Sequence, residues 1–171
     1  SKMKRTPRPY AEIEALFDLS DDDKTLFRTF FTEEPPAPYR KYEGDKIRMR
    51  YFGHACILVE TKDVSILVDP LISYYGYMSS VEHFSDLDLP ETIDYVLITH
   101  NHQDHILFET LLPLRHKIRH LIVPRSGGGA LQDPKLKLMF RNIGFNQVSE
   151  IDDLETLSMA DCNITGIPFT G

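Results

Sequence analysis

One segment of this 171-residue chain constrains its fold more than any other: residues 95–106, YVLITHNHQDHI. An apolar, β-branched run is followed at once by three histidines and one aspartate, at offsets i, i+2, i+4 and i+5, which do not share one face of an α-helix. These residues are His100, His102, Asp104 and His105. The run 94–99 is typical of a strand buried on both faces, so the cluster is predicted to occupy the loop at its C-terminal end.

Strand-like segments surround this loop. From residue 46 onward, β-branched and aromatic runs alternate with turn signals, which predicts strands at 46–52, 55–61, 64–70, 94–99, 119–124 and, more briefly, within 147–169. Helices are predicted at 107–118, ending near Pro113, and at 133–145, with Asp133 as N-cap, Pro134 at the first helical position and Gly144 at the C-terminal end. Hairpins followed by β-loop-α units indicate a mixed α/β layered domain.

The first 45 residues have a different pattern. Two short helices are predicted before residue 32, with Pro9 in the first turn of one and Ser20, followed by three aspartates, as the N-cap of the other. Residues 32–45 contain three prolines and a glycine, which is typical of a linker. We therefore expect a helical N-terminal arm with a Pro-rich linker over 1–45 and a separate α/β domain over 46–171.

Composition narrows the class of partner and compartment. The net charge is −7 and there is no run of Lys or Arg, so a nucleic-acid partner is not expected. Cys56 and Cys162 are too few for a disulfide framework, which favours a reducing, cytoplasmic setting. The longest apolar runs are of strand length, well short of the about 20 residues that span a bilayer, and no membrane partner is expected.

The cluster has the chemistry of a metal site. Imidazole nitrogens and carboxylate oxygens are ligands of zinc and iron. Strand-like alternation would send His100, His102 and Asp104 to one side, with His105 adjoining them. Four ligands from one loop exceed what a single catalytic ion takes while keeping a position open for water, which favours two divalent ions. A merely His-rich surface loop is the weaker alternative, because the loop follows a core strand.

The motif THNHQDH resembles the Thr-His-x-His-x-Asp-His motif of the metallo-β-lactamase fold superfamily, and YFGHACILVE with ILVDP resembles elements of its UlaG-like branch. The resemblance implies an αββα sandwich, of which this chain would hold the N-terminal half. It also implies that His100 and His102 hold one metal ion and that Asp104 with His105 holds the second. Asp69 and Thr99 would be neighbours that orient these ligands.

A second resemblance is to metallo-β-lactamase-fold diiron oxygenases that β-hydroxylate amino acids in chloramphenicol biosynthesis. It rests on segments between Leu111 and Gly171, among them LIVPRSGGGALQD and ITGIPFTG. This resemblance implies iron in place of zinc, and oxidation in place of hydrolysis.

Other residues have both a functional and a structural interpretation. His54 and Cys56 are predicted to alternate on one strand face; His54 would be a catalytic, orienting or substrate-contacting residue, and Cys56 a small buried one. The segment 126–129, Ser-Gly-Gly-Gly, lacks the Gly-Lys-Ser/Thr of a phosphate loop and is interpreted as a flexible loop. Residues 73–80, SYYGYMSS, could line a substrate opening or form a packed loop. The remaining histidines are predicted at the surface or at helix ends: His83, His116 and His120.

Two enzyme classes follow. In a hydrolase, two divalent ions, zinc first and iron or manganese next, would activate water against a phosphoester, amide, lactone or thioester, with Asp104 orienting the nucleophile. In an oxidoreductase, two irons would activate dioxygen. A metal-storage or binding module is a third reading. The expected partners are a small-molecule substrate and a second chain or a second copy that supplies the other half of the sandwich.

Overall fold

The computed structural model describes residues 8–34, 39–72, 83–128, 133–159 and 162–168. The chain divides into two compact units, Ser1–Pro38 and Tyr39–Gly171. Each unit is described by itself.

The first unit contains the two short helices that the sequence predicts, α2 (Tyr10–Glu14) and α3 (Asp21–Arg28). Ser20 caps α3, because its Oγ accepts a hydrogen bond from the backbone N–H of Asp23 at 3.2 Å. Pro9 is itself the N-cap residue of α2 rather than a residue of its first turn. Four aromatic rings pack between the helices: Tyr10, Phe17, Phe27 and Phe31.

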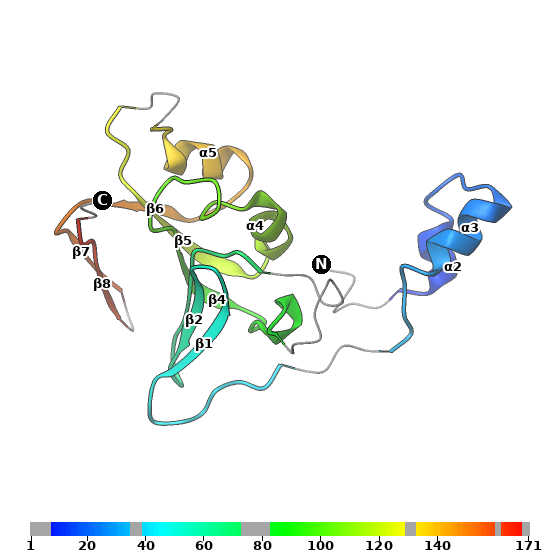
Figure 1. The fold of residues 1–171 in the computed structure, drawn as a ribbon, viewed down its shortest axis with the longest axis horizontal. Helices are drawn as coiled ribbons and strands as arrows, with labels where there is room; N and C mark the ends of the chain where they lie inside the picture. The colour runs from blue at the N-terminus through cyan, green and yellow to red at the C-terminus, as the bar shows by residue number, and fades with distance from the viewer. Residues whose placement is uncertain (1–7, 35–38, 73–82, 129–132, 160–161, 169–171) are drawn as a thin grey trace. The chain divides into compact units, whose positions relative to one another are not determined.

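The second unit is built on a six-stranded sheet with the order β1-β2-β3-β4-β5-β6 (Figure 1). The pairs β1–β2 and β2–β3 are antiparallel, whereas β3–β4, β4–β5 and β5–β6 are parallel. The strands are β1 (Arg48–Gly53), β2 (Cys56–Glu60), β3 (Ser65–Val68), β4 (Ile93–Leu97), β5 (Ile118–Pro124) and β6 (Val148–Ile151). The mixed α/β class predicted from the sequence is the one observed.

The remaining elements are short. Between β3 and β4 lies a 3-10 turn, η1 (Asp86–Asp88), and the parallel strands are connected through the helices α4 (Phe108–Leu114) and α5 (Leu136–Asn142). A separate antiparallel ribbon pairs β7 (Thr156–Ser158) with β8 (Asn163–Thr165). No helix in the described ranges combines the length and the apolar character needed to cross a membrane.

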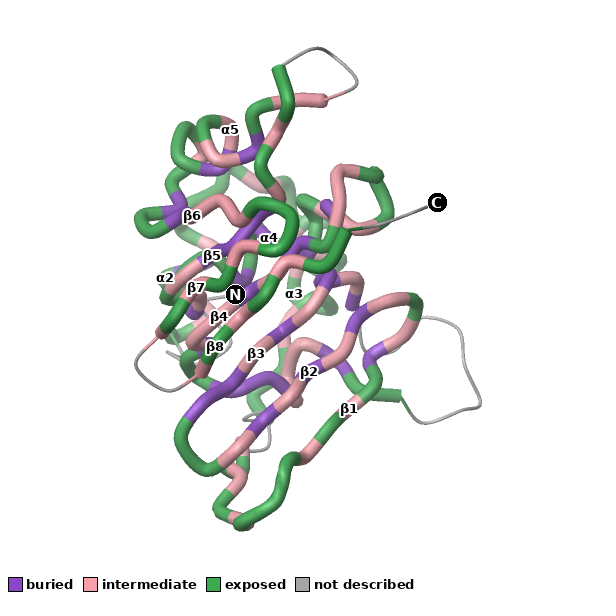
Figure 2. The backbone as a smooth tube through the Cα atoms, turned by 90° about the vertical axis from the view of Figure 1, so that its left-hand side faces the viewer, coloured by how far each residue is buried: buried purple, intermediate pink, exposed green. Residues whose placement is uncertain are grey.

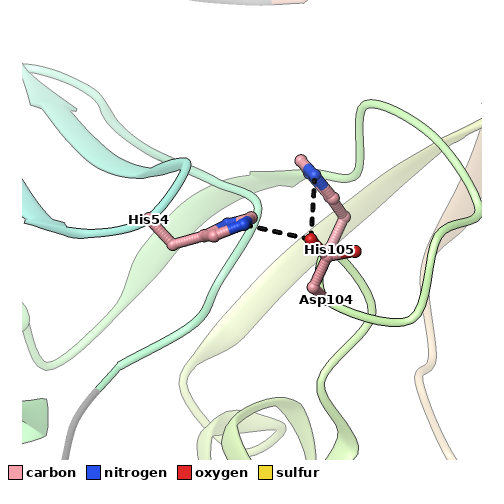
Figure 3. A group of neighbouring side chains, drawn as sticks. All are labelled: His54, Asp104 and His105. Carbon is pink, nitrogen blue, oxygen red and sulfur yellow. Dashed lines mark ion pairs between the residues drawn. The ribbon is translucent and has the colours of Figure 1, made fainter.

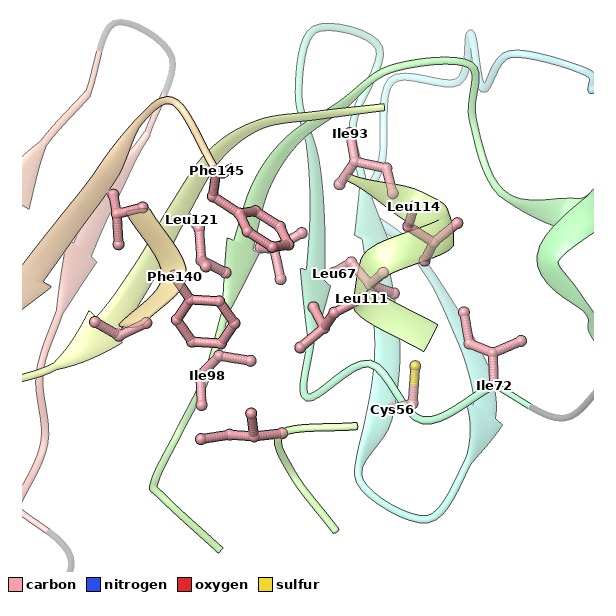
Figure 4. Close-up of a cluster of buried hydrophobic side chains, with 14 of the residues drawn as sticks. Cys56, Leu67, Ile72, Ile93, Ile98, Leu111, Leu114, Leu121, Phe140 and Phe145 are labelled. Atoms are coloured by element: carbon pink, nitrogen blue, oxygen red, sulfur yellow. The ribbon is translucent and has the colours of Figure 1, made fainter. Parts of the chain in front are cut away.

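One face of the sheet forms the core of this unit. Side chains of alternate strand residues, such as Leu67 and Leu121, are fully buried and pack with Leu111 of α4 and Phe140 of α5 (Figure 4). Burying each of these side chains stabilises the fold by roughly 1.5–3 kcal/mol. Along β2 and β3, buried positions alternate with half-buried ones (Figure 2). This core anchors the C-terminal ends of β3 and β4, where the histidine-rich loop begins.

The opposite face of the sheet is apolar but only partly covered. Ile57, Val68 and Leu97 occupy neighbouring register positions on it, and each is half-buried. On the edge strand β1, Met49 and Tyr51 are exposed by 65% and 63%. The prediction that residues 94–99 are buried on both faces is therefore wrong for one face, because α4 and α5 pack on the other.

The helix α5 begins two residues later than the sequence predicts. Lys135 is its N-cap residue, so Asp133 does not cap it. The carboxylate of Asp133 instead accepts hydrogen bonds from the backbone N–H groups of Gly127 and Gly128, so these amides are already occupied by a carboxylate of the chain. The C-terminal prediction is confirmed: Gly144 has a φ of 91°, and the next N–H, that of Phe145, bonds the carbonyl of Phe140.

The histidines outside the cluster have separate environments. His83 and His116 are exposed, and His116 Nδ1 lies 2.9 Å from the Pro113 carbonyl at the end of α4, as the sequence predicts. His120 differs from the prediction, because it lies half-buried on β5 with Nε2 2.8 Å from Ser149 Oγ. The tyrosine-rich segment 73–80 lies outside the described residues.

Candidate metal centre

The histidine-rich loop lies where two parallel strands end side by side. The backbone N–H of Asp69, the first residue after β3, bonds the carbonyl of Leu97 at the end of β4 at 2.9 Å. This contact places the Asp69 side chain next to Thr99 and the loop that follows β4. Asp69 has a φ of 40°, in the left-handed region that Asp adopts more readily than most residues.

Three histidines of the loop gather closely. His100 Nε2 lies 2.9 Å from His102 Nδ1, and the rings of His100 and His105 are 3.9 Å apart between centroids. A turn brings His105 back toward the first two, since its N–H bonds the carbonyl of His102 at 3.0 Å. The side chains therefore converge through a turn rather than through strand alternation.

Asp69 and Thr99 form a hydrogen-bond network behind these histidines. Asp69 is only 2% exposed. Its Oδ1 accepts from the Thr99 backbone N–H at 2.8 Å, and its Oδ2 accepts from the Thr99 hydroxyl at 2.6 Å. His105 Nδ1 lies 2.8 Å from the same Oδ2. An ionised carboxylate can only accept, so the proton of His105 is assigned to Nδ1, which leaves the lone pair of Nε2 able to bind a metal ion.

The network extends to His100. The Thr99 hydroxyl gives its proton to Asp69, so at 2.9 Å it can only accept from His100 Nδ1. This assigns the Nδ1–H form to His100 as well and turns its Nε2 toward His102. The two residues thus select, for His100 and His105, the tautomer that suits a metal ligand.

His54 reaches the same place from a distant part of the chain. It lies in the turn between β1 and β2, with a φ of 48° directly after Gly53 at 115°. The prediction that it shares a strand face with Cys56 is wrong, because only Cys56 belongs to β2, where it is fully buried in the core. His54 Nε2 lies 3.0 Å from Asp104 Oδ2, and His105 Nε2 lies 3.9 Å from the same oxygen (Figure 3).

The electrostatics favour the metal-binding forms of two of these groups. Burial lowers the pKa of His100, and the neighbouring His105 and His102 lower it further, which keeps its imidazole neutral. A hydrogen bond from its own backbone N–H lowers the pKa of Asp104, and the nearby histidines add to this effect. A neutral imidazole and an ionised carboxylate are the forms that bind metal.

The donor set fits a divalent transition metal. His54, Asp104 and His105 each offer one ligand atom, and these atoms lie within 4.8 Å of one another. Metal–nitrogen and metal–oxygen bonds of about 2.0–2.2 Å place the ligands of one tetrahedral ion roughly 3–4 Å apart. His100 and His102 lie beside this group with ring nitrogens in hydrogen-bond contact.

The spacing of the loop residues grouped His100, His102, Asp104 and His105, and the family resemblance added Asp69 and Thr99; the structure brings all six together. The interpretation of the sequence did not associate His54 with Asp104, which lies fifty positions further along the chain. The signal for that association was the Gly53-His54 pair, because a glycine between two strand-like runs marks a turn that can aim the next side chain.

Comparisons with known proteins agree with this chemistry. Residues 48–170 match the family model described as a Beta-lactamase superfamily domain. The chain is 43% identical over 166 residues to the 4-amino-L-phenylalanyl-(CmlP-peptidyl-carrier-protein) 3-hydroxylase of Streptomyces venezuelae, covering 94% of this chain and 31% of that protein. It is 30% identical over 118 residues to a UPF0173 protein of Pyrococcus abyssi, covering 69% of this chain and 46% of that protein.

Two further matches are to a protein named as a metal-dependent hydrolase and to a crystal structure. A UPF0173 metal-dependent hydrolase of Rhizobium johnstonii is 33% identical over 61 residues, covering 35% of this chain and 24% of that protein. The crystal structure of CmlA, a diiron β-hydroxylase from Streptomyces venezuelae, matches with a TM-score of 0.75 and 41% identity, over 94% of this chain and 29% of that one. The chain thus spans less than half the length of the relatives it matches.

Proposed function

Because the chain belongs to the β-lactamase superfamily, we propose that it carries the metal-binding loop of a metal-dependent enzyme with a dinuclear centre. The observation that carries this proposal is the convergence of four loop side chains, backed by a buried carboxylate. His100 and His102 would hold one ion, and Asp104 with His105 the other. Asp69 and Thr99 would fix the tautomers of His100 and His105.

The activity that we favour is hydroxylation with two irons, on a substrate that carries an amino-acid group. The support is the 43% identity to a 3-hydroxylase, which extends over 94% of this chain, whereas the match to a protein named a metal-dependent hydrolase covers 35%. Two irons in such a site would supply the activation of dioxygen. Conversion of C–H to C–OH consumes one O₂, two electrons and two protons and releases one water, so a two-electron donor is required.

Hydrolysis is the second candidate, and the hydrolase match is the observation in its favour. In that case two zinc or manganese ions would lower the pKa of a bound water. Asp104, exposed at the open side of the cluster, would then orient the attacking oxygen toward a phosphoester, amide, lactone or thioester. The order of the two candidates is the reverse of the order that the sequence motifs alone suggest.

The two candidates differ in metal and in co-substrate. We would purify the full-length protein, determine its metals by elemental analysis, and follow oxygen uptake with a chemical two-electron donor and aminoacyl substrates. Two irons per chain, oxygen uptake and a product 16 mass units heavier are expected, from the addition of one oxygen atom. Two zinc ions with hydrolysis of a model ester and no oxygen uptake would favour the hydrolase. A protein that binds no metal would contradict both.

A further inference from the structure

We propose that His54, in the β1–β2 turn, is a third ligand of the ion held by Asp104 and His105. The inference rests on the proposed function, because it assumes that the loop binds metal. It adds a ligand from a different part of the sheet, so that the second ion would connect the β1–β2 turn to the loop after β4.

Distance is the first support. His54 Nε2 and His105 Nε2 approach the same oxygen of Asp104, at 3.0 and 3.9 Å. These separations match the roughly 3–4 Å between ligands of one small divalent ion. The rings of His54 and His105 are edge-on, with centroids 5.1 Å apart, and the contacts of both residues converge on one oxygen of Asp104 (Figure 3).

The donor atoms that face one another are the second support. His105 Nδ1 is occupied by Asp69, so its Nε2 is the nitrogen available on the side of Asp104. His54 likewise presents Nε2 to this carboxylate. Two imidazole nitrogens and one carboxylate oxygen are the ligand set of many catalytic zinc sites, in which a fourth position stays open to water. Here Asp104 and His54 are the exposed members, so that position would face solvent.

The backbone conformation of the β1–β2 turn is the third support for the assignment of His54 as a ligand. His54 has a φ of 48°, in the left-handed region that non-glycine residues seldom adopt, and Gly53 at 115° allows the chain to turn immediately before it. The turn is the connection between two registered strands, with Gly53 opposite Cys56 at its base. Because Cys56 is fully buried in the core, the position from which His54 projects is fixed.

The alternative role for His54 is to hold Asp104 by a hydrogen bond without touching metal. A glutamine can still donate a hydrogen bond to that carboxylate, but it lacks the imidazole nitrogen. His54→Gln and His54→Ala therefore separate the two roles. His116→Gln is the matched control, because it removes an exposed histidine whose ring bonds the Pro113 carbonyl, outside the cluster.

The test is a Co²⁺ titration of the metal-free, full-length protein, followed by visible absorption and by equilibrium dialysis. Wild type and His116→Gln are expected to bind two ions. Both His54 variants are expected to keep one ion and to bind the second more than about 100-fold more weakly, beyond the loss typical of a group that only orients a ligand. The absorption of the second ion should also change, because its coordination changes.

Each other outcome overturns the inference. If His54→Gln binds the second ion within about 100-fold of wild type, whether or not His54→Ala does, then His54 only orients Asp104 or plays no part. Retention of one ion by the variants shows that they are folded. A wild-type protein that binds fewer than two ions would contradict the dinuclear centre itself, which distinguishes failure of the proposed function from failure of the His54 assignment.

Discussion

His105 and Asp69 form a partly buried pair that joins two adjacent parallel strands: Nδ1 of the histidine lies 2.8 Å from Oδ2 of an aspartate that is 2% exposed. Asp69 follows β3, and His105 lies in the loop that follows β4. The pair therefore couples the geometry of the sheet to the orientation of one proposed ligand.

Replacing Asp69 with Asn tests this coupling. The amide has only one acceptor oxygen, so it cannot accept all three hydrogen bonds that the carboxylate accepts from Thr99 and His105, and we expect metal affinity to fall by about 10- to 100-fold. Isothermal titration with Zn²⁺ measures it. Asp94→Asn is the control, because Asp94 bonds Ser65 and Arg119 across neighbouring strands and should affect stability alone. Wild-type affinity in Asp69→Asn would remove the orienting role.

Thr99 offers a sharper comparison, because its hydroxyl connects Asp69 with His100. Thr99→Ser keeps the hydroxyl and should bind metal within a few-fold of wild type. Thr99→Val keeps the shape but loses the hydroxyl, so we expect weaker metal binding and a mixture of His100 tautomers. Imidazole ¹⁵N NMR of the metal-free protein reads the tautomer directly. Identical spectra for the Val variant and wild type would contradict the assignment.

His102→Ala should remove bound metal and activity together, because His102 is one of the two proposed ligands of the first ion. Elemental analysis and an activity assay on the same preparation measure both. His83→Ala, which removes an exposed histidine outside the cluster, serves as the control. Full metal content in His102→Ala would show that its ring is not a ligand.

His120 gives a pH dependence that is independent of metal. Burial on β5 lowers its pKa in the folded state below its usual value near 6.5. Well above pH 6.5, His120 is neutral in both the folded and the unfolded protein. As the pH falls below 6.5, the unfolded chain binds a proton at His120 before the folded protein does. The free energy of unfolding therefore falls until the pH passes the pKa of His120 in the folded state. We expect the free energy of unfolding in urea to fall more between pH 7.5 and 5 for wild type than for His120→Gln. Equal falls would contradict the prediction.

The half-covered sheet face predicts self-association of this chain when it is prepared alone. Met49 and Tyr51 extend the face to an exposed edge strand, and such an edge readily pairs with another strand. Sedimentation should show association that depends on concentration, and Met49→Lys with Tyr51→Lys should reduce it. Leu138→Lys, on an exposed side of α5, is the matched control. A wild-type monomer at all concentrations would show that the face needs no cover.

Several features could be read from the sequence because their cause is local. Ser20 caps α3 and Gly144 ends α5, since each acts on backbone groups a few residues away. The cluster from His100 to His105 could be placed in a loop for the same reason, because a strand-length apolar run precedes it. The mixed α/β class followed from the alternation of strand and helix periods.

Local patterns failed where two partners compete for one side chain, or where burial depends on elements that are distant in sequence. Asp133 precedes a proline and a helical run, as an N-cap would, yet its carboxylate bonds the amides of Gly127 and Gly128. The run 95–98 is apolar, yet only one of its faces is packed by helices. The residue pattern of a strand cannot tell whether one or both of its faces are covered, because burial depends on which elements pack against each face.

The residue types proposed to bind metal could be predicted from the sequence alone, because metal ligands need imidazole and carboxylate groups at short spacing. How these groups are combined depends on the tertiary structure. The parallel pairing of β3 with β4 sets Asp69 behind His105, and the β1–β2 turn carries His54 to Asp104. The physical reason is that a hydrogen bond or a shared ligand position is fixed by distances of about 3 Å, and strand register, not sequence separation, sets those distances.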